Sequence, residues 1–390
     1  MNNKYDSLKI TVLIIVIFVA GFFIYKNMAN RNGSQGGSVI NSSTNIKFEK
    51  GIWVANGIDQ PVLKEVLAST DVSGVFLRYK WKTLNPSAES YDWSMLDTAL
   101  SAIKTSGKPA KLGIVAGGET PDWVYNSSGI RTLTFKEFPL GGKKNANSFT
   151  LRIAVPWDTA YIEDWNTFVQ AMASHLHQAG TYDTVITVMI NGIARETAET
   201  RLPYQKSITN IAGEISTDAP ALWTTVGYTP DKVVNAWKAI ANNYKNNFPD
   251  KSLAVAAITP TQAFPWMTAS GEPANTFEET RVNVMQRIVN SCVADFHSQC
   301  IAQFNSLTAT SGELPVVLDA GRRGATIGWQ VQLENQAFPE CLKNHTTCDQ
   351  NAFSAILTNG FKNGSFVEVS PRNVIAYPEA IHAIAESMGN

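Results

Sequence analysis

Apolar and polar positions along residues 51–390 alternate between two patterns. Short, mostly apolar runs rich in β-branched residues are followed by longer segments in which apolar residues recur at helical spacing. This alternation predicts strands joined by helices, and hence a parallel sheet. Eight strands are expected, at residues 51–56, 75–81, 110–116, 185–190, 253–258, 301–307, 326–331 and 366–369.

A helical segment follows each of the eight strands. The helices are expected at residues 60–69, 94–105, 158–178, 230–248, 278–296, 314–321, 351–361 and 378–387. Eight strand–helix units favour a (β/α)8 TIM barrel over an open doubly wound sheet. The longest connections follow the third and fourth strands, and ligands of such barrels bind at these strand ends. A substrate cleft is therefore expected there.

Residues 10–25 form an apolar run with Lys9 before it and Lys26 after it. Sixteen residues of helix span about 24 Å, slightly less than a bilayer core of about 30 Å, and snorkelling lysines make up the difference. We interpret residues 1–26 as an uncleaved signal anchor, the alternative being a cleaved signal peptide. Residues 27–45, rich in Asn, Ser and Gly, are interpreted as a flexible tether, and residues 46–390 as the single barrel domain.

The four cysteines fall into two close pairs, Cys292 with Cys300 and Cys341 with Cys348. Neither spacing suits a zinc site, so two short disulfide loops in an exported chain are the better interpretation. The barrel is therefore expected outside the cytoplasm, either membrane-anchored or secreted. The alternative is four unpaired thiols in a cytosolic protein.

Composition narrows the classes of partner. The formal net charge is −1 and charged residues make up 17% of the chain, which gives no electrostatic basis for binding nucleic acid. No glycine-rich nucleotide motif follows a strand, so no cofactor is expected, and no metal either. We expect a monomer.

The second strand and its helix resemble a known family. The run Gly74 to Trp81, which contains Arg78, precedes a turn at Pro86 and a helix that opens at Tyr91-Asp92-Trp93-Ser94. It resembles (β/α)8-barrel glycoside hydrolases of the β-galactosidase-like and β-amylase-like kind. The segments Glu119–Trp123 and Pro156–Asp158 resemble the same family. The resemblance implies that Arg78, Trp81, Asp122 and Trp123 bind sugar at the barrel mouth.

The resemblance also implies a proton donor after the fourth strand. Glu199 and Pro203 match the family's Glu-x-x-x-Pro segment, so Glu199 is the implied general acid, with Glu196 as second choice. A carboxyl group walled by Trp is desolvated, and desolvation raises its pKa toward the working pH. The alternative is that both are solvated loop carboxylates.

Glycoside hydrolysis usually needs a second carboxylate. The family's nucleophile lies at the end of the seventh strand, where this chain has Gln330. Glu334 is the candidate nucleophile or base, with Asp122 and Glu368 as further candidates. Glu368 is alternatively a structural partner of Arg78.

Two function classes follow: a glycosidase acting on an extracytoplasmic glycan, or a barrel that binds glycan without cutting it because Gln330 replaces the nucleophile. In either case the expected substrate-binding residues are Arg78, Trp81, Asp122, Trp123, Asn191, Asn305, Trp329, Gln330 and Glu368.

A protein that starts near Ile46 is expected to fold as a soluble monomer without residues 1–45. The sharp change of composition between the tether and the first strand motivates this prediction. Size-exclusion chromatography with circular dichroism tests it, and aggregation of the shortened protein beside a well-behaved full chain contradicts it.

Overall fold

The computed structural model describes residues 48, 50–138, 147–310, 313–332 and 339–389. The chain divides into two units, Met1–Asn45 and Ile46–Asn390, and the described residues all lie in the second. Eight parallel strands form a closed barrel in the order β1-β10-β9-β8-β7-β6-β3-β2. They are β1 (Gly51–Ala55), β2 (Val72–Lys80), β3 (Ala110–Val115), β6 (Val185–Met189), β7 (Ser252–Ala257), β8 (Cys300–Leu307), β9 (Thr326–Val331) and β10 (Phe366–Val369). The predicted TIM barrel is confirmed.

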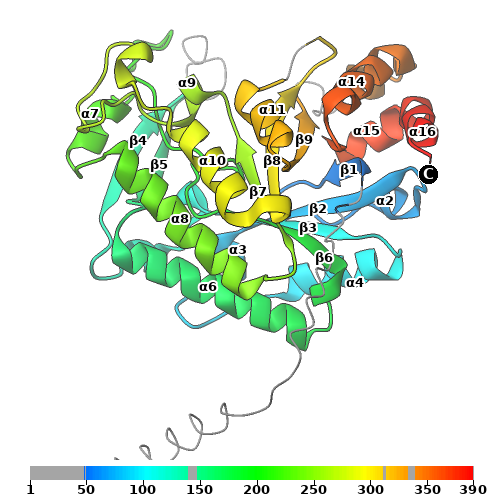
Figure 1. Ribbon diagram of the computed structural model, residues 1–390, viewed down its shortest axis with the longest axis horizontal. Helices are drawn as coiled ribbons and strands as arrows, with labels where there is room; N and C mark the ends of the chain where they lie inside the picture. Colours follow the sequence, from blue (N-terminus) through cyan, green and yellow to red (C-terminus); the bar gives the residue numbers. More distant parts are fainter. Residues whose placement is uncertain (1–47, 49, 139–146, 311–312, 333–338, 390) are drawn as a thin grey trace, which may run out of the picture. The chain divides into compact units, whose positions relative to one another are not determined.

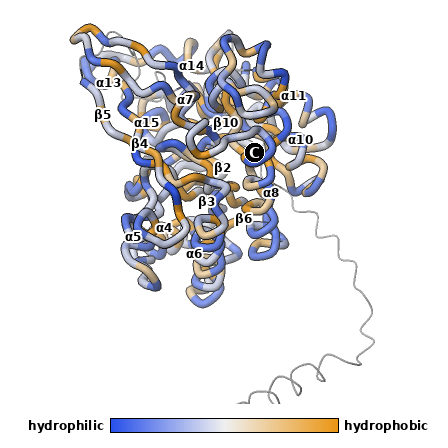
Figure 2. Tube along the Cα trace, turned by 90° about the vertical axis from the view of Figure 1, so that its left-hand side faces the viewer, coloured by the Kyte–Doolittle hydropathy of each residue, from blue (hydrophilic) through white to orange (hydrophobic). Residues whose placement is uncertain are grey.

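Helices surround the barrel (Figure 1). The main ones are α4 (Ser94–Thr105), α6 (Thr159–Gln178), α8 (Pro230–Asn247), α10 (Val284–Phe296), α11 (Pro315–Arg322), α14 (Gln350–Asn363) and α16 (Pro378–Ser387). Hydrophilic and hydrophobic stretches alternate along helices such as α4 and α6 (Figure 2), as expected of helices that bury one face against a sheet. The large core between strands and helices contains Trp81, Trp165 and Trp237, each at most 1% exposed.

A second, smaller core fills the inside of the barrel. Its large members are Trp53, Phe76 and Phe366, all nearly fully buried. Glycines on the inward face of neighbouring strands make room for them: a Cβ at Gly328 would lie 2.1 Å from the Phe366 ring, and one at Gly74 would lie 2.6 Å from Trp53. The interior is therefore a packed core rather than a pore.

Two parts of the helical pattern differ from the prediction. The first helix, expected at residues 60–69, is the five-residue α2 (Lys64–Ala68). The helix expected from residue 278 begins at Val284 instead, because Arg281 adopts a left-handed conformation and the Asn283 side chain caps the backbone N–H of Gln286.

The long connection after β3 contains an unexpected antiparallel hairpin of β4 (Thr132–Glu137) and β5 (Phe149–Ala154). It lies beside α7 (Ala219–Thr224) at the left of Figure 1. The alternation of buried Leu133 and Phe135 with outward polar residues is the period-two signal of a strand. The hairpin is joined to the loop after β6 by ion pairs of Arg195 with Glu137 and of Lys136 with Glu214.

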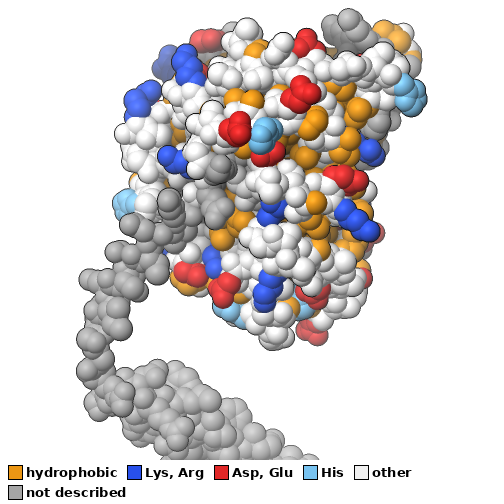
Figure 3. Space-filling view, turned by 90° about the vertical axis from the view of Figure 1, so that its right-hand side faces the viewer, with side chains coloured by type: hydrophobic (Ala, Val, Ile, Leu, Met, Phe, Trp, Pro, Cys, Tyr) orange, Lys and Arg blue, Asp and Glu red, His pale blue; other side chains and the backbone are white. Residues whose placement is uncertain are grey.

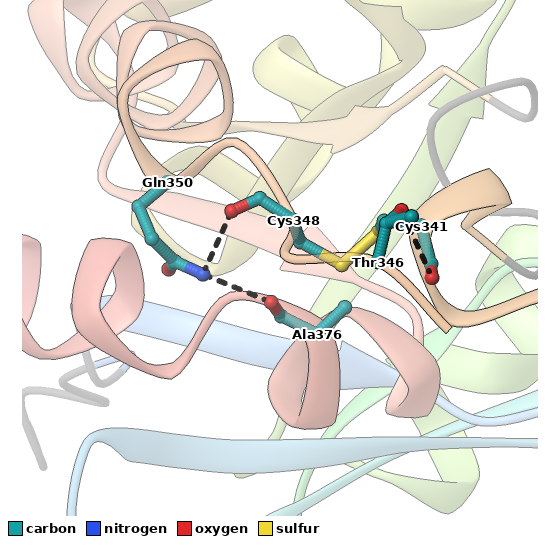
Figure 4. Close-up of a disulfide and its surroundings, with 5 residues drawn as sticks. All are labelled: Cys341, Thr346, Cys348, Gln350 and Ala376. Carbon is teal, nitrogen blue, oxygen red and sulfur yellow. Dashed lines mark hydrogen bonds between the residues drawn. A yellow bond between two sulfur atoms is a disulfide. The ribbon is translucent and has the colours of Figure 1, made fainter. Parts of the chain in front are cut away.

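Both predicted disulfides are confirmed. Cys292–Cys300 joins the end of α10 to the start of β8, and Cys341–Cys348 closes the loop before α14. In Figure 4, Gln350 follows the second disulfide and donates its amide to the carbonyls of Cys348 and Ala376. This amide ties the disulfide loop to α15 (Pro371–Ala376).

Within the part of the chain that the structure describes, no helix combines the length and apolar character that a membrane crossing requires. The apolar run at residues 10–25 lies outside that part. The face of the barrel domain in Figure 3 carries positive and negative side chains interspersed with hydrophobic ones, without a large patch of either sign.

Candidate active site

A cavity of about 140 Å³ lies at the C-terminal ends of the fourth to sixth strands of the barrel. Glu199 and Arg201 line it from the loop after β6, and Phe304, Asn305 and Ser306 line it from β8. The end of β7 supplies Ala257, and the loop after it supplies Ile258, Thr259 and Gln262. Its position at the strand ends is the usual place of ligand and catalytic groups in this fold.

Glu199 is the carboxylate of this cavity. Its Oε1 accepts a hydrogen bond of 2.9 Å from Nδ2 of Asn305, whereas its Oε2 is buried without a protein partner. Burial alone would raise the pKa of Glu199, but the charge of Arg201, the nearby Thr197 hydroxyl and the hydrogen bond from Asn305 outweigh burial and hold the pKa below its ordinary value. The raised pKa expected from the sequence is therefore wrong, and Glu199 is ionised at neutral pH.

Glu196 has the opposite electrostatic balance. Burial raises its pKa, and the nearby charge of Glu199 adds to this, while Arg195 and Arg201 oppose it. Its Oε1 contacts both arginines, and Arg195 also pairs with Glu137 on β4. The two arginine charges together offset the desolvation of Glu196 only in part. Two carboxyl groups of one loop thus have pKa values shifted in opposite directions.

A buried polar network lies deeper in the barrel. Nζ of Lys111 on β3 contacts Oε1 of Glu368 on β10 at 2.7 Å, and both side chains are fully buried. Oε2 of Glu368 accepts from the amide of Gln303 on β8 at 2.7 Å and from the amide of Gln330 on β9 at 3.2 Å. Each of these partners donates to Glu368, so both of its carboxyl oxygens are engaged inside the barrel. Burial lowers the pKa of Lys111, and the charge of Glu368 opposes this shift.

The structure does not pair Glu368 directly with Arg78, the partner considered from the sequence. Arg78 donates from Nε and Nη2 to the carbonyl of Asn56, at 2.9 and 2.6 Å. Burial lowers the pKa of Arg78, and the charges of Glu199 and Glu368 partly restore it. Arg78 is therefore close enough to both carboxylates to interact electrostatically with each.

Two of the predicted sugar-binding tryptophans are core residues. Trp81 is fully buried, makes an edge contact with Trp165 at 4.8 Å between ring centroids, and donates its indole N–H to Asn85. Trp329 is 1% exposed and packs against Gly360 and Gly364 around α14. Because neighbouring residues of a strand point to opposite faces, Trp329 lies outside the barrel while Gln330 points inward.

Three further predicted residues, Asp122, Trp123 and Asn191, do not line this cavity. Trp123, partly buried, donates its N–H to the carbonyl of Asn85, and Asp122 is an exposed residue at the start of α5 (Asp122–Tyr125). Asn191 is buried, accepts from the backbone N–H of Ile114 and donates to the carbonyl of Ala198. Asn191 thus holds the loop after β6 in place.

Of the substrate-binding set predicted from the sequence, Asn305, Gln330 and Glu368 meet in one hydrogen-bonded network that reaches Glu199. The candidate nucleophile Glu334 lies outside the described residues. Lys111, Gln303 and Arg201 were not predicted from the sequence. Gln303 and Asn305 are two residues apart on one strand and hence on one face, which is the signal that would have found Gln303.

Comparisons with known proteins return structures but no sequence relatives: no family model matches the chain, and no curated protein does. The exo-β-1,4-mannosidase Op5Man5 from Opitutaceae bacterium strain TAV5 is similar over 88% of this chain at 11% identity, with a TM-score of 0.43. This chain spans 57% of that protein's length.

Two further structures have similar scores. One is a GH10 protein from Paenibacillus barcinonensis (10% identity, 84% of each chain, TM-score 0.40). The other is the intracellular xylanase TsXylA from Thermoanaerobacterium saccharolyticum JW/SL-YS485 (10% identity, 84% of this chain and 86% of that chain, TM-score 0.41). The fold assignment rests on the closed strand order described above.

Proposed function

We propose that the protein is a glycoside hydrolase that binds a glycan at the cavity beside Glu199. The observation that carries this proposal is the Oε2 atom of Glu199, a buried carboxylate oxygen without a protein partner at the cavity. A buried, unpaired carboxylate oxygen requires a hydrogen-bond donor, and sugar hydroxyls and water are suitable donors. The cavity is smaller than the about 300–1,000 Å³ of typical ligand sites, so we expect it to enclose only a small part of a glycan.

The directions of the two pKa shifts suggest how the roles divide. A carboxyl group with a raised pKa suits proton donation, and one with a lowered pKa suits a base or nucleophile. Glu196 contacts Arg201 of the cavity wall through Oε1, and its Oε2 has no protein partner. We assign this Oε2 as the donor of a proton to the leaving glycosidic oxygen, and Glu199 as the ionised carboxylate that accepts a proton from the attacking water. This differs from the roles considered from the sequence, where Glu199 is the general acid, Glu196 the second choice for that role and Glu334 the nucleophile or base.

A second candidate function is glycan binding without hydrolysis. Gln330 favours it, because an amide stands where the resembling family has its nucleophile, and this amide is engaged with Glu368. An amide does not form a stable glycosyl ester. In this case Glu199 accepts hydrogen bonds from sugar hydroxyls and takes part in no reaction.

We also propose that the barrel works outside the cytoplasm, held at a membrane by residues 10–25. Two disulfides support an oxidising compartment. The apolar run and the polar tether that follows it support the anchor.

The proposal is tested by incubating the protein with a panel of oligosaccharides and measuring the release of reducing sugar from pH 3 to 9. A bell-shaped profile is expected. Its acid limb falls as Glu199 is protonated, below the ordinary pKa of a glutamate, and its alkaline limb falls as Glu196 loses its proton. Binding without sugar release at any pH identifies the second candidate, and the absence of both binding and release contradicts the proposal.

A further inference from the structure

A continuous chain of hydrogen bonds joins the buried Lys111–Glu368 pair to Glu199 at the mouth of the barrel. It runs from Lys111 to Gln303, from Gln303 to Asn305 at 2.8 Å, and from Asn305 to Glu199 at 2.9 Å. The two amides come from the same face of β8, two residues apart. The chain thus connects a group with no solvent exposure to the carboxylate at the cavity.

The lysine decides which way the first amide points. A lysine ammonium has three donors and no acceptor, so the atom of Gln303 that it contacts is the carbonyl oxygen. Nζ has two further neighbours: Oε1 of Glu368 lies 2.7 Å away, and the centre of the Phe76 ring lies 4.5 Å away. With its oxygen held by Lys111, Gln303 presents its NH₂ group to the remaining neighbours.

The orientation of the Gln303 amide in turn sets the orientation of the Asn305 amide. The NH₂ group of Gln303 donates to Oε2 of Glu368 and to Oδ1 of Asn305. Since the oxygen of Asn305 is thereby engaged, its own NH₂ group is the end that faces Glu199. Oε1 of Glu199 consequently meets a donor, which favours the ionised form of the carboxylate.

We propose that Gln303 and Asn305 are positioning residues that hold Glu199 as an ionised acceptor, with their orientation set by the Lys111–Glu368 pair. The proposal rests on the proposed function only in that Glu199 is the working carboxylate, and it deepens that function by naming what prepares Glu199. The charged groups that face Glu199 are Arg201 and Glu196 from its own loop and Arg78 from β2. None of these three charged residues is changed in the variants that test the proposal.

The test measures the pKa of Glu199 directly, by carboxyl ¹³C NMR of full-length protein labelled at glutamate, with Glu199→Gln identifying the resonance. Asn305→Ala removes the hydrogen-bond donor that faces Oε1 of Glu199. Because the loss of a hydrogen bond to a charged group corresponds to about one pKa unit or more, the pKa of Glu199 should rise by this amount. Gln303→Met frees the Asn305 amide to turn its oxygen toward Glu199, so the pKa is expected to rise here as well. Asn305 is only half buried, so its variant remains informative if the Gln303 variant does not fold.

Gln330→Met is the matched control. Gln330 donates to the same oxygen of Glu368 as Gln303 does, but the described contacts give it no link to Asn305. The pKa of Glu199 should be unchanged in this variant. In the double variant Gln303→Met/Asn305→Ala, the pKa should equal that of Asn305→Ala alone, because Gln303 acts through Asn305.

Three results would overturn the proposal: an unchanged pKa in the folded Asn305 or Gln303 variant, an equal shift in the Gln330 control, or additive shifts in the double variant. The readout needs no substrate, so it is separate from the proposed function. A protein that neither binds nor cuts glycan would refute the function and leave this measurement intact. Conversely, hydrolysis could depend on Glu199 while the pKa of Glu199 is unchanged in Asn305→Ala. This result would refute the positioning role of Gln303 and Asn305 and leave the proposed function intact.

Discussion

Replacing Glu199 with glutamine is expected to lower the turnover of a glycan by about 10²–10⁴-fold, the usual contribution of a general acid or base. Glutamine keeps the shape of the side chain and its contact with Asn305 through the amide oxygen, but it cannot accept a proton from water. Activated aryl glycosides should lose activity to a similar extent, because a better leaving group does not replace the missing base. Initial rates on both substrates measure the effect.

Glu196→Gln is the companion variant that separates the two roles. If Glu196 donates the proton, its replacement impairs the natural glycan strongly and the activated aryl glycoside much less, because a good leaving group needs little protonation. The reverse pattern, with Glu199→Gln sparing the aryl glycoside, would return Glu199 to the general-acid role implied by the family resemblance. Full activity of Glu199→Gln on both substrates would contradict the site assignment itself.

Replacing Lys111 with methionine is expected to lower the free energy of unfolding by about 3–5 kcal/mol. Glu368 would remain as a buried charge without its cation, and removing one partner of a buried ion pair typically costs that much. Lys111 and Glu368 are both fully buried, so water does not restore the lost contact. Urea unfolding followed by tryptophan fluorescence measures the change.

The double variant Lys111→Met/Glu368→Gln is the matched control for this effect. With the second charge removed, the loss of stability should be clearly smaller than the sum of the two single losses, since the cost arises from an unpaired charge rather than from lost volume. A loss below about 1 kcal/mol in Lys111→Met would contradict a charged pair inside the barrel.

The eight barrel strands could be predicted because each is a short apolar run bounded by turn residues, and the helices between them have a clear amphipathic period. The hairpin β4–β5 was missed although Leu133, Phe135, Leu151 and Ile153 alternate with polar residues. Its strands lie between β3 and α6, where a (β/α)8 barrel needs only a loop. The expected barrel topology therefore led us to read this segment as a loop, although its apolar and polar residues alternate as in a strand.

Only part of the candidate site could be predicted from the sequence. Glu199 and Asn305 were found, but Trp329 and Gln330 were both assigned to the cleft although adjacent strand residues cannot share a face. Lys111 was missed because a single lysine in an apolar strand does not reveal its partner. That partner, Glu368, lies 257 residues along the chain, and only barrel closure brings the two together. The pKa of Glu199 likewise depends on Arg201 and Asn305, whose positions relative to it are set by the tertiary structure.

The most direct test of the central claim is a crystal structure of the Glu199→Gln variant soaked with an oligosaccharide that binds the wild-type protein. We expect a sugar in the cavity between Arg201 and Asn305, with a sugar oxygen within hydrogen-bond distance of the side chain at position 199. An oligosaccharide bound elsewhere on the barrel, with this cavity holding only water, would contradict it.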